Sequence, residues 1–184
     1  MGYSSKSPWL IHYDGSSCNG CDIEVLDSMM PLYDIERFGI INTGNPKHAD
    51  IFLVTGSVNA QNIEVVRHIY DQMLEPKVVV ACGICACTGG VFRDCYNVIG
   101  GVDKAIPVDV YAPGCAVRPE TIIDAVLQAV KILDEKAKLM AEGKDPATAP
   151  RAGILPPKGC ACAQDADGST ANSTAAKTDE KKEA

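Results

Sequence analysis

The residues best suited to chemistry in this chain are its nine cysteines, six of which fall into three short groups. Cys18 and Cys21 form a C-x-x-C pair in SSCNGCDIE, three more lie in ACGICACTGG, and Cys115 lies in APGCAVRPE. Each group contains glycine, which lets the backbone approach a sulfur atom closely and present N–H donors to it. The three groups therefore indicate a metal or redox centre.

Short apolar runs alternate with helical segments along the chain. Residues 51–55 (IFLVT) and 77–81 (KVVVA) are β-branched runs, typical of strands that are covered on both faces. Further strands are expected over residues 9–13, 35–41 and 106–111, and helices over residues 22–30, 59–74 and 119–139. This alternation predicts an α/β fold of the flavodoxin-like type, with a mainly parallel sheet and helices on both faces.

Each cysteine group follows a predicted strand. The carboxyl ends of parallel strands meet at one edge of an open sheet, and ligands bind there. We therefore expect all three groups to lie in loops at that edge, although Cys85 and Cys115 come 64 and 94 residues after Cys21. The topology alone predicts one shared metal site.

The pattern of a close pair and remote single cysteines favours a 4Fe–4S cluster, which needs four thiolates. Structural zinc usually has two close pairs of ligands. A thioredoxin-type dithiol at Cys18 and Cys21 is a further alternative. Spacing alone does not choose the ligand of the middle group among Cys82, Cys85 and Cys87, although Cys82 ends an apolar run and has the character of a core residue. Cys95 is interpreted in the same way, as a packing cysteine.

Charge and composition exclude several classes of protein. The formal charge of −7 argues against a nucleic-acid partner, because nucleic acid selects a basic surface. The N-terminus has no obvious export signal, and no apolar run approaches the roughly 18 residues of a membrane span. An odd number of cysteines in a reducing cytosol fits metal ligands better than disulfides. The chain is expected to be soluble and cytosolic unless a partner holds it at a membrane.

Two regions are expected from composition. Residues 1–140 are predicted to form one flavodoxin-like iron–sulfur domain. Residues 141–184 are short of large apolar side chains and predict a low-complexity, extended or disordered tail. Cys160 and Cys162 lie in this tail, where unpaired thiols are favoured over a weak extra metal site.

Several motifs in order resemble one known family. These are SSCNGCDIE, TGSV at residues 55–58, GICACTGGVF, GGVDKAIPVDVYAPGC and RPE, which together span about residues 8–135. They resemble the small subunit of membrane-bound, energy-converting NiFe hydrogenases, which is related to the cluster-bearing subunit of respiratory complex I. The complex I protein has tandem cysteines, whereas this chain has Gly20 beside Cys21 and its other cysteine at position 18. That spacing is the hydrogenase pattern.

The resemblance also implies which thiols are ligands. The third motif resembles G-x-C-A-x-[ST]-G-G, which implies Cys85 and leaves Cys82 and Cys87 outside. The fourth resembles P-G-C-P-P-R-P-E, which implies Cys115, with Ala116 and Val117 in place of two prolines. The implied ligands of one 4Fe–4S cluster are Cys18, Cys21, Cys85 and Cys115.

The family implies an electron-transfer role within a larger oxidoreductase, with no catalytic residue or substrate site on this chain. The cluster would be the proximal one, next to a large subunit that holds the NiFe centre. A ferredoxin-like two-cluster subunit would deliver electrons, and membrane antiporter-like subunits would couple reversible proton reduction to ion translocation. The chain would be peripheral, on the cytoplasmic side of the cell membrane. The alternatives are a complex I-type quinone oxidoreductase subunit and a structural zinc-binding assembly protein.

Other polar side chains near the motifs have simpler interpretations. Glu24 could move protons near the cluster, but an acid that stabilises the helix N-terminus is favoured. Arg118 could donate to the cluster or face the large subunit, and an exposed guanidinium is the alternative. His12 is expected to be a hydrogen-bonded core or interface histidine rather than a ligand. His48 and His68 are expected at the surface. The turn at residues 55–57 is expected on the cluster edge.

Overall fold

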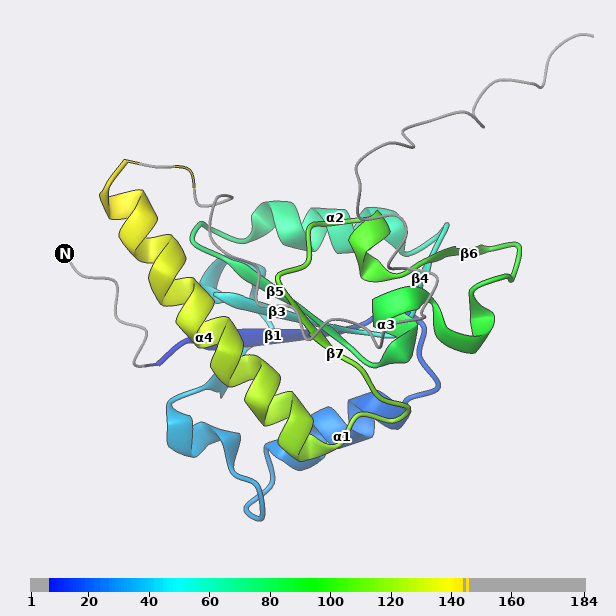
Figure 1. The fold of residues 1–184 in the computed structure, drawn as a ribbon, viewed down its shortest axis with the longest axis horizontal. Coiled ribbons are helices and arrows are strands. Elements are labelled where there is room, and N and C mark those ends of the chain that lie inside the picture. The colour runs from blue at the N-terminus through cyan, green and yellow to red at the C-terminus, as the bar shows by residue number, and fades with distance from the viewer. Residues whose placement is uncertain (1–6, 144, 146–184) are drawn as a thin grey trace, which may run out of the picture.

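The computed structural model describes residues 7–143 and residue 145. Five parallel strands form the main sheet in the order β2-β1-β3-β5-β7 (Figure 1). The strands are β1 (Trp9–Asp14), β2 (Ile41–Asn42), β3 (Ile51–Thr55), β5 (Val78–Cys82) and β7 (Val110–Ala112). Counted within this sheet alone, the order is the flavodoxin-like 2-1-3-4-5. The predicted α/β class is confirmed.

The central strands have the sequences expected of their place in the sheet. All residues of β3 and β5 are buried, and the two strands pair in register from Ile51 with Val78 to Thr55 with Cys82. Near-continuous β-branched runs fit this environment because both faces of the sheet are covered. The strand expected over residues 106–111 is shorter, because only Val110–Ala112 pairs with β5.

The strand predicted over residues 35–41 is largely wrong. Ile35–Phe38 is a 3-10 helix, and Gly39 after it has a φ of 82°. Only Ile41–Asn42 pairs as a strand, at the edge beside β1. Ile35 and Ile40 bury their side chains in the core through this turn rather than through strand pairing. An apolar run of this length does not by itself distinguish the two structures.

Helices cover both faces of the sheet, as predicted. Figure 1 shows α1 (Gly20–Ser28) and α4 (Pro119–Ala141) on one face and α2 (Ile63–Gln72) on the other. The core divides in the same way, since Val25 and Val126 belong to the first layer and Val66 to the second. The short helix α3 (Ile84–Thr88) follows β5 and packs into the second layer through Ala86. None of the helices in this described part is both long and apolar enough to cross a bilayer.

The cysteine-bearing end of the molecule also contains small elements that the sequence did not predict. β4 (Val58–Asn59) and β6 (Val98–Gly100) form a separate antiparallel pair. α2 begins four residues later than expected, at Ile63, because the Asn62 side chain accepts a hydrogen bond from the Asn59 backbone at 2.7 Å and closes a turn. The predicted tail lies almost entirely outside the described residues, as do Cys160 and Cys162.

A buried ion pair joins α4 to the sheet. Lys136 Nζ lies 2.9 Å from both carboxylate oxygens of Asp109 and 2.9 Å from the carbonyl oxygen of Lys77. Asp109 also accepts a hydrogen bond from the Val79 backbone at 3.0 Å. Buried charges are costly unless they are paired in this way. The pair therefore fixes where the C-terminal half of α4 crosses the sheet.

Candidate metal centre

The carboxyl ends of β1, β5 and β7 bring the three cysteine groups together at one edge of the sheet. Cys18 lies in the turn before α1, and Cys21 is the second residue of that helix. Cys85 lies in α3, and Cys115 lies between β7 and α4. The prediction of one shared edge is confirmed, but that of loops is only partly right, because Cys21 and Cys85 belong to helices and Cys82 is the last residue of β5.

Glycine positions show how closely the backbone approaches the sulfurs. A Cβ atom at Gly83 would lie 2.7 Å from Cys21 Sγ, and one at Gly90 would lie 3.1 Å from Cys85 Sγ. A Cβ at Gly20 would meet both Cys18 Sγ, at 3.4 Å, and Ala116 Cβ, at 3.5 Å. The first motif therefore packs directly against the other two. Larger residues at these glycines would fill the space around the thiols.

The thiols are also electrostatically coupled. Burial raises the pKa of Cys85, and negative charge on Cys21, Cys115 and Cys18 raises it further. For Cys21 the leading cause is again burial, which raises its pKa, while a backbone hydrogen bond from Val117 opposes the shift and Asp22, Cys18 and Cys115 add to it. Four thiolates at this edge would repel one another, so they need a cationic centre to hold them together.

The remaining described cysteines have different surroundings. Cys82 is fully buried in the core layer beneath α4, and burial raises its pKa. Cys87 is buried in the opposite core layer, where its Sγ lies 3.6 Å from the carbonyl oxygen of Ala81. Cys95 is exposed, which contradicts its interpretation as a packing residue. Cys85 is the half-buried thiol of the middle group and is coupled to Cys18, Cys21 and Cys115.

The four predicted ligands have the donor chemistry of an iron–sulfur site, but they are not arranged as a closed metal site. No group of three or more His, Cys, Asp or Glu side chains within residues 7–143 and 145 is arranged to hold a metal ion. The observation that fits a cluster is a set of four thiols from three chain segments, with glycine backbone beside Cys18, Cys21 and Cys85. The charges of the other thiols help to raise the pKa values of Cys21 and Cys85. Thiolates are the usual ligands of 4Fe–4S clusters, and backbone N–H groups around them tune the potential.

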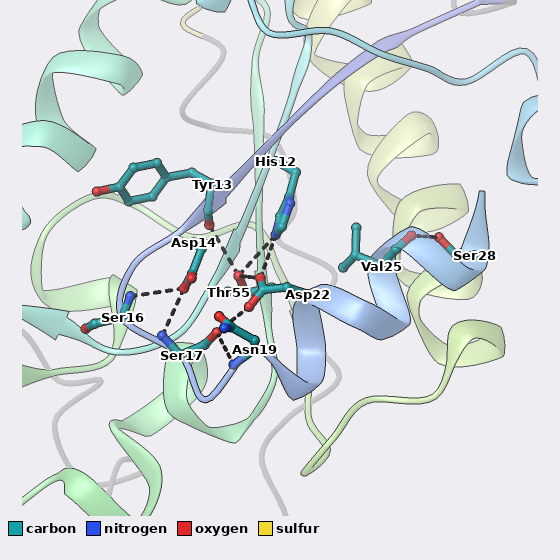
Figure 2. Close-up of polar contacts among 10 residues, drawn as sticks. All are labelled: His12, Tyr13, Asp14, Ser16, Ser17, Asn19, Asp22, Val25, Ser28 and Thr55. Carbon is teal, nitrogen blue, oxygen red and sulfur yellow. Dashed lines mark hydrogen bonds and ion pairs between the residues drawn. The ribbon is translucent and has the colours of Figure 1, made fainter. Parts of the chain in front are cut away.

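A second polar group, which the sequence did not reveal, surrounds Asp22, the residue after Cys21, and Figure 2 shows its contacts. His12 Nε2 lies 2.9 Å from Asp22 Oδ1 and 3.1 Å from Thr55 Oγ1. The hydroxyls of Thr55 and Ser17 both donate hydrogen bonds to the Asp22 carboxylate. His12 is thus hydrogen-bonded, as expected. The only sequence signal for Asp22 was its position directly after Cys21.

The other charged and histidine side chains singled out in the sequence are exposed or half-buried. Arg118 is exposed at the N-cap of α4, and Glu24 is half-buried within α1. His48 and His68 are exposed, as expected, and the His48 ring lies 5.6 Å from the Trp9 ring. Thr55 and the two residues after it are buried at the cysteine-bearing edge, also as expected.

A flavodoxin-like domain with thiols gathered at the carboxyl edge of its sheet defines a class of redox subunit. The family model described as "NADH ubiquinone oxidoreductase, 20 Kd subunit" matches residues 18–129, a range that includes all four predicted ligands. The chain belongs to this family, whose members are iron–sulfur subunits of oxidoreductases. The predicted kinship with hydrogenase small subunits and the complex I protein is confirmed.

Individual relatives point to both branches of the family. The probable membrane-bound hydrogenase subunit mbhJ of Pyrococcus furiosus is 44% identical over 144 residues, which cover 78% of this chain and 84% of the relative. An NADH-quinone oxidoreductase subunit of Citrifermentans bemidjiense is 45% identical over 123 residues, covering 66% and 71%. Among solved structures, a chain of the archaeal membrane-bound sulfane sulfur reductase aligns with a TM-score of 0.62 at 38% identity, covering 71% and 72%. The relatives are subunits of oxidoreductase complexes, which confirms that this chain is an oxidoreductase subunit.

Proposed function

We propose that this chain is the electron-transfer small subunit of a multi-subunit, energy-converting NiFe hydrogenase. Its ligands Cys18, Cys21, Cys85 and Cys115 would hold one 4Fe–4S cluster, the proximal one of the complex. The observation that carries the proposal is the gathering of these four thiols, from three chain segments, at the carboxyl edge of the sheet, where glycine backbone lies beside Cys18, Cys21 and Cys85. When bound, such a cluster accepts and donates one electron at a time.

The chain's own residues would position this one-electron carrier. Four protein thiolates leave no position on the iron for a substrate, so the role is relay rather than catalysis. Gly83 and Gly90 leave room beside two of the sulfurs, and the Val117 backbone hydrogen-bonds to Cys21. Cys18 and Cys115 are exposed on this chain, so shielding of the cluster from water would depend on partner subunits.

The spacing of the first pair supports the hydrogenase branch. A Cβ atom added at Gly20 would lie 3.4 Å from Cys18 Sγ and 3.5 Å from Ala116 Cβ, which are ordinary contact distances. The branch assignment therefore depends on the C-x-x-C spacing of Cys18 and Cys21, with glycine at position 20. Similarity to a protein named as a probable membrane-bound hydrogenase subunit supports the same assignment.

Exposed apolar side chains around the cysteines support a role within a complex. Three of them follow Cys21 on or just after α1, and three follow Cys85 beyond α3: Ile23, Leu26 and Met30, and Val91, Phe92 and Tyr96. Apolar groupings of this kind mark surfaces that bind other proteins. We assign them to the partners, namely the NiFe-containing large subunit, the ferredoxin-like two-cluster subunit and the membrane antiporter-like subunits. These partners would hold the chain on the cytoplasmic side of the membrane.

A complex I-type quinone oxidoreductase subunit is the second candidate, and the similarity to an NADH-quinone oxidoreductase favours it. The two candidates differ in their partner chains and reactions. The native complex, purified anaerobically, should contain a chain with two C-x-x-C pairs for NiFe and should evolve hydrogen from reduced ferredoxin. A complex that lacks that chain and reduces quinone would overturn the hydrogenase proposal in favour of the second candidate.

A zinc-binding assembly module gives a different result again. The iron–sulfur proposal predicts a brown protein with broad absorption near ~400 nm and iron bound to this chain. A colourless protein with stoichiometric zinc would contradict both electron-transfer candidates.

A further inference from the structure

We propose that Asp22 is a positioning residue, which acts with His12 and Thr55 to fix the turn that carries Cys18 and Cys21 onto the sheet. This inference rests on the proposed function, because it concerns ligands of the same cluster. It assigns a role to Asp22, the residue after Cys21, and to two residues on separate strands.

The Asp22 carboxylate connects three elements (Figure 2). Its Oδ1 atom lies 2.9 Å from His12 Nε2 and accepts a hydrogen bond from the Thr55 hydroxyl. His12 is in β1 and Thr55 is the last residue of β3, and these are neighbouring strands. One carboxylate oxygen therefore ties the first turn of α1, immediately after Cys21, to two strands of the sheet.

The other carboxylate oxygen holds the opposite side of the turn. The Ser17 hydroxyl donates to Asp22 Oδ2 and accepts from the Asn19 backbone at 2.9 Å. Ser17 and Asn19 are the two neighbours of Cys18, so these bonds fix the backbone on both sides of that thiol. Asn19 has a φ of 64°, a left-handed conformation that is uncommon for a residue other than glycine.

Burial makes this network costly to break. The side chains of His12 and Asp22 are only 17% and 14% exposed, and Thr55 is fully buried. Removal of the carboxylate would take away the acceptor that both partners share. The Thr55 hydroxyl would keep only the Tyr13 carbonyl oxygen at 3.4 Å, and His12 Nε2 only the Thr55 hydroxyl at 3.1 Å. Loss of a buried partner costs more than the bond contributes when made. Helix α1 itself is also held by Val25, which is buried in the core. Asp22 is therefore needed to place the turn that carries the cysteines, whereas the helix itself has a second anchor in Val25.

The test is made on the intact complex with Asp22→Ala, Thr55→Val and the conservative Thr55→Ser. Three properties are measured: the EPR spectrum of the reduced cluster, its midpoint potential and the rate of iron loss to a chelator. We expect Asp22→Ala and Thr55→Val to shift the spectrum and the midpoint and to speed iron loss several-fold. Thr55→Ser keeps the hydroxyl, so its spectrum, midpoint potential and rate of iron loss should equal those of the wild type. Asp27→Ala, which removes a carboxylate from the same helix, is the matched control and should change none of them.

Two results would overturn the proposal. One is a wild-type spectrum and midpoint in Thr55→Val, and the other is an equal shift in Asp27→Ala, which would indicate helix charge rather than positioning. If the Asp22→Ala variant fails to assemble, the Thr55→Val variant alone tests the positioning role. Thr55→Val changes neither the charge nor the size of the side chain appreciably. The proposed function fails separately if Cys21→Ser keeps the wild-type cluster signal. Loss of that signal in Cys21→Ser, with no effect of Thr55→Val, would refute only the positioning role.

Discussion

At the scale of single residues, the choice of ligands depends on which thiols can reach a common space. The sequence predicted the C-x-x-C pair and Cys115 as ligands directly, because each stands alone in a glycine-containing segment. It did not distinguish the three thiols of the middle group without the family resemblance. The structure shows why they differ, since Cys82 and Cys87 are buried in opposite core layers and Cys85 is coupled to the other three thiols.

The network around Asp22 could not be predicted from the sequence. Thr55 lies 33 residues beyond Asp22, and His12 lies ten residues before it on a strand. Only the pairing of β1 with β3 places the two partners side by side. A histidine in a strand and an acid at a helix start each have an ordinary local explanation, so nothing in their spacing indicated that they meet.

Gly83 gives a direct test of how tightly the backbone fits the thiols. A Cβ atom added there would lie 2.7 Å from Cys21 Sγ. The backbone of Gly83 has a φ of 91° and a ψ of 156°, a conformation available essentially to glycine. We expect Gly83→Ala to lose most of the bound iron and about 1–3 kcal/mol of stability. Iron analysis and urea unfolding measure the two effects.

Gly44→Ala is the control for this substitution. Position 44 has open space around an added Cβ and no positive φ. Full iron content in both variants would show that iron binding does not need the close approach of the Gly83 backbone to Cys21.

At the scale of elements, long buried strands were predictable and short edge elements were not. Residues 51–55 were placed correctly because five consecutive apolar or β-branched residues suit a strand that is covered on both faces. The strand predicted over residues 35–41 was largely wrong because Gly39 takes a left-handed conformation and turns the chain before β2. β4 and β6 have only two and three residues, which is too few for a periodic pattern.

The attachment of α4 to the sheet gives a prediction about stability. Lys136→Ala leaves the buried Asp109 carboxylate without its cation, so we expect a loss of about 3–5 kcal/mol in the free energy of unfolding. Lys131→Ala changes an exposed lysine of the same helix and should stay within about 0.5 kcal/mol of the wild type. Urea unfolding of the purified chain measures both. Equal stability of the two variants would show that the ion pair does not hold the helix in place.

At the scale of the whole molecule, the sequence predicted the class of fold but not which side chains and glycines that fold brings into contact. The alternation of strands and helices pointed to a parallel sheet, and the carboxyl-edge rule then predicted that distant thiols meet. Cys21 packs against Gly83, and Gly20 packs against Ala116. Both contacts depend on β1, β3, β5 and β7 being consecutive in the sheet. Such tertiary neighbours cannot be deduced from local patterns.

The apolar side chains near the cysteines predict how the molecule joins its complex. Leu26 is 55% exposed on α1, close in sequence to Cys21. We expect Leu26→Asp to reduce the amount of partner subunits that co-purify with the chain, with little change in the unfolding of the chain itself, because the side chain is outside the core. Val65→Asp, at an exposed position of α2 on the other face of the sheet, should retain the partners. Equal retention by both variants would contradict the assigned surface.

The central claim is that four particular thiols hold one 4Fe–4S cluster, and the EPR spectrum of the reduced complex tests it most directly. Single changes to serine at Cys18, Cys21, Cys85 and Cys115 should each abolish or alter the signal of this cluster. The same change at Cys82, Cys87 or Cys95 should leave it intact. Loss of the signal in Cys87→Ser together with its retention in Cys85→Ser would contradict the ligand set, and an unchanged signal in all seven variants would contradict the cluster itself.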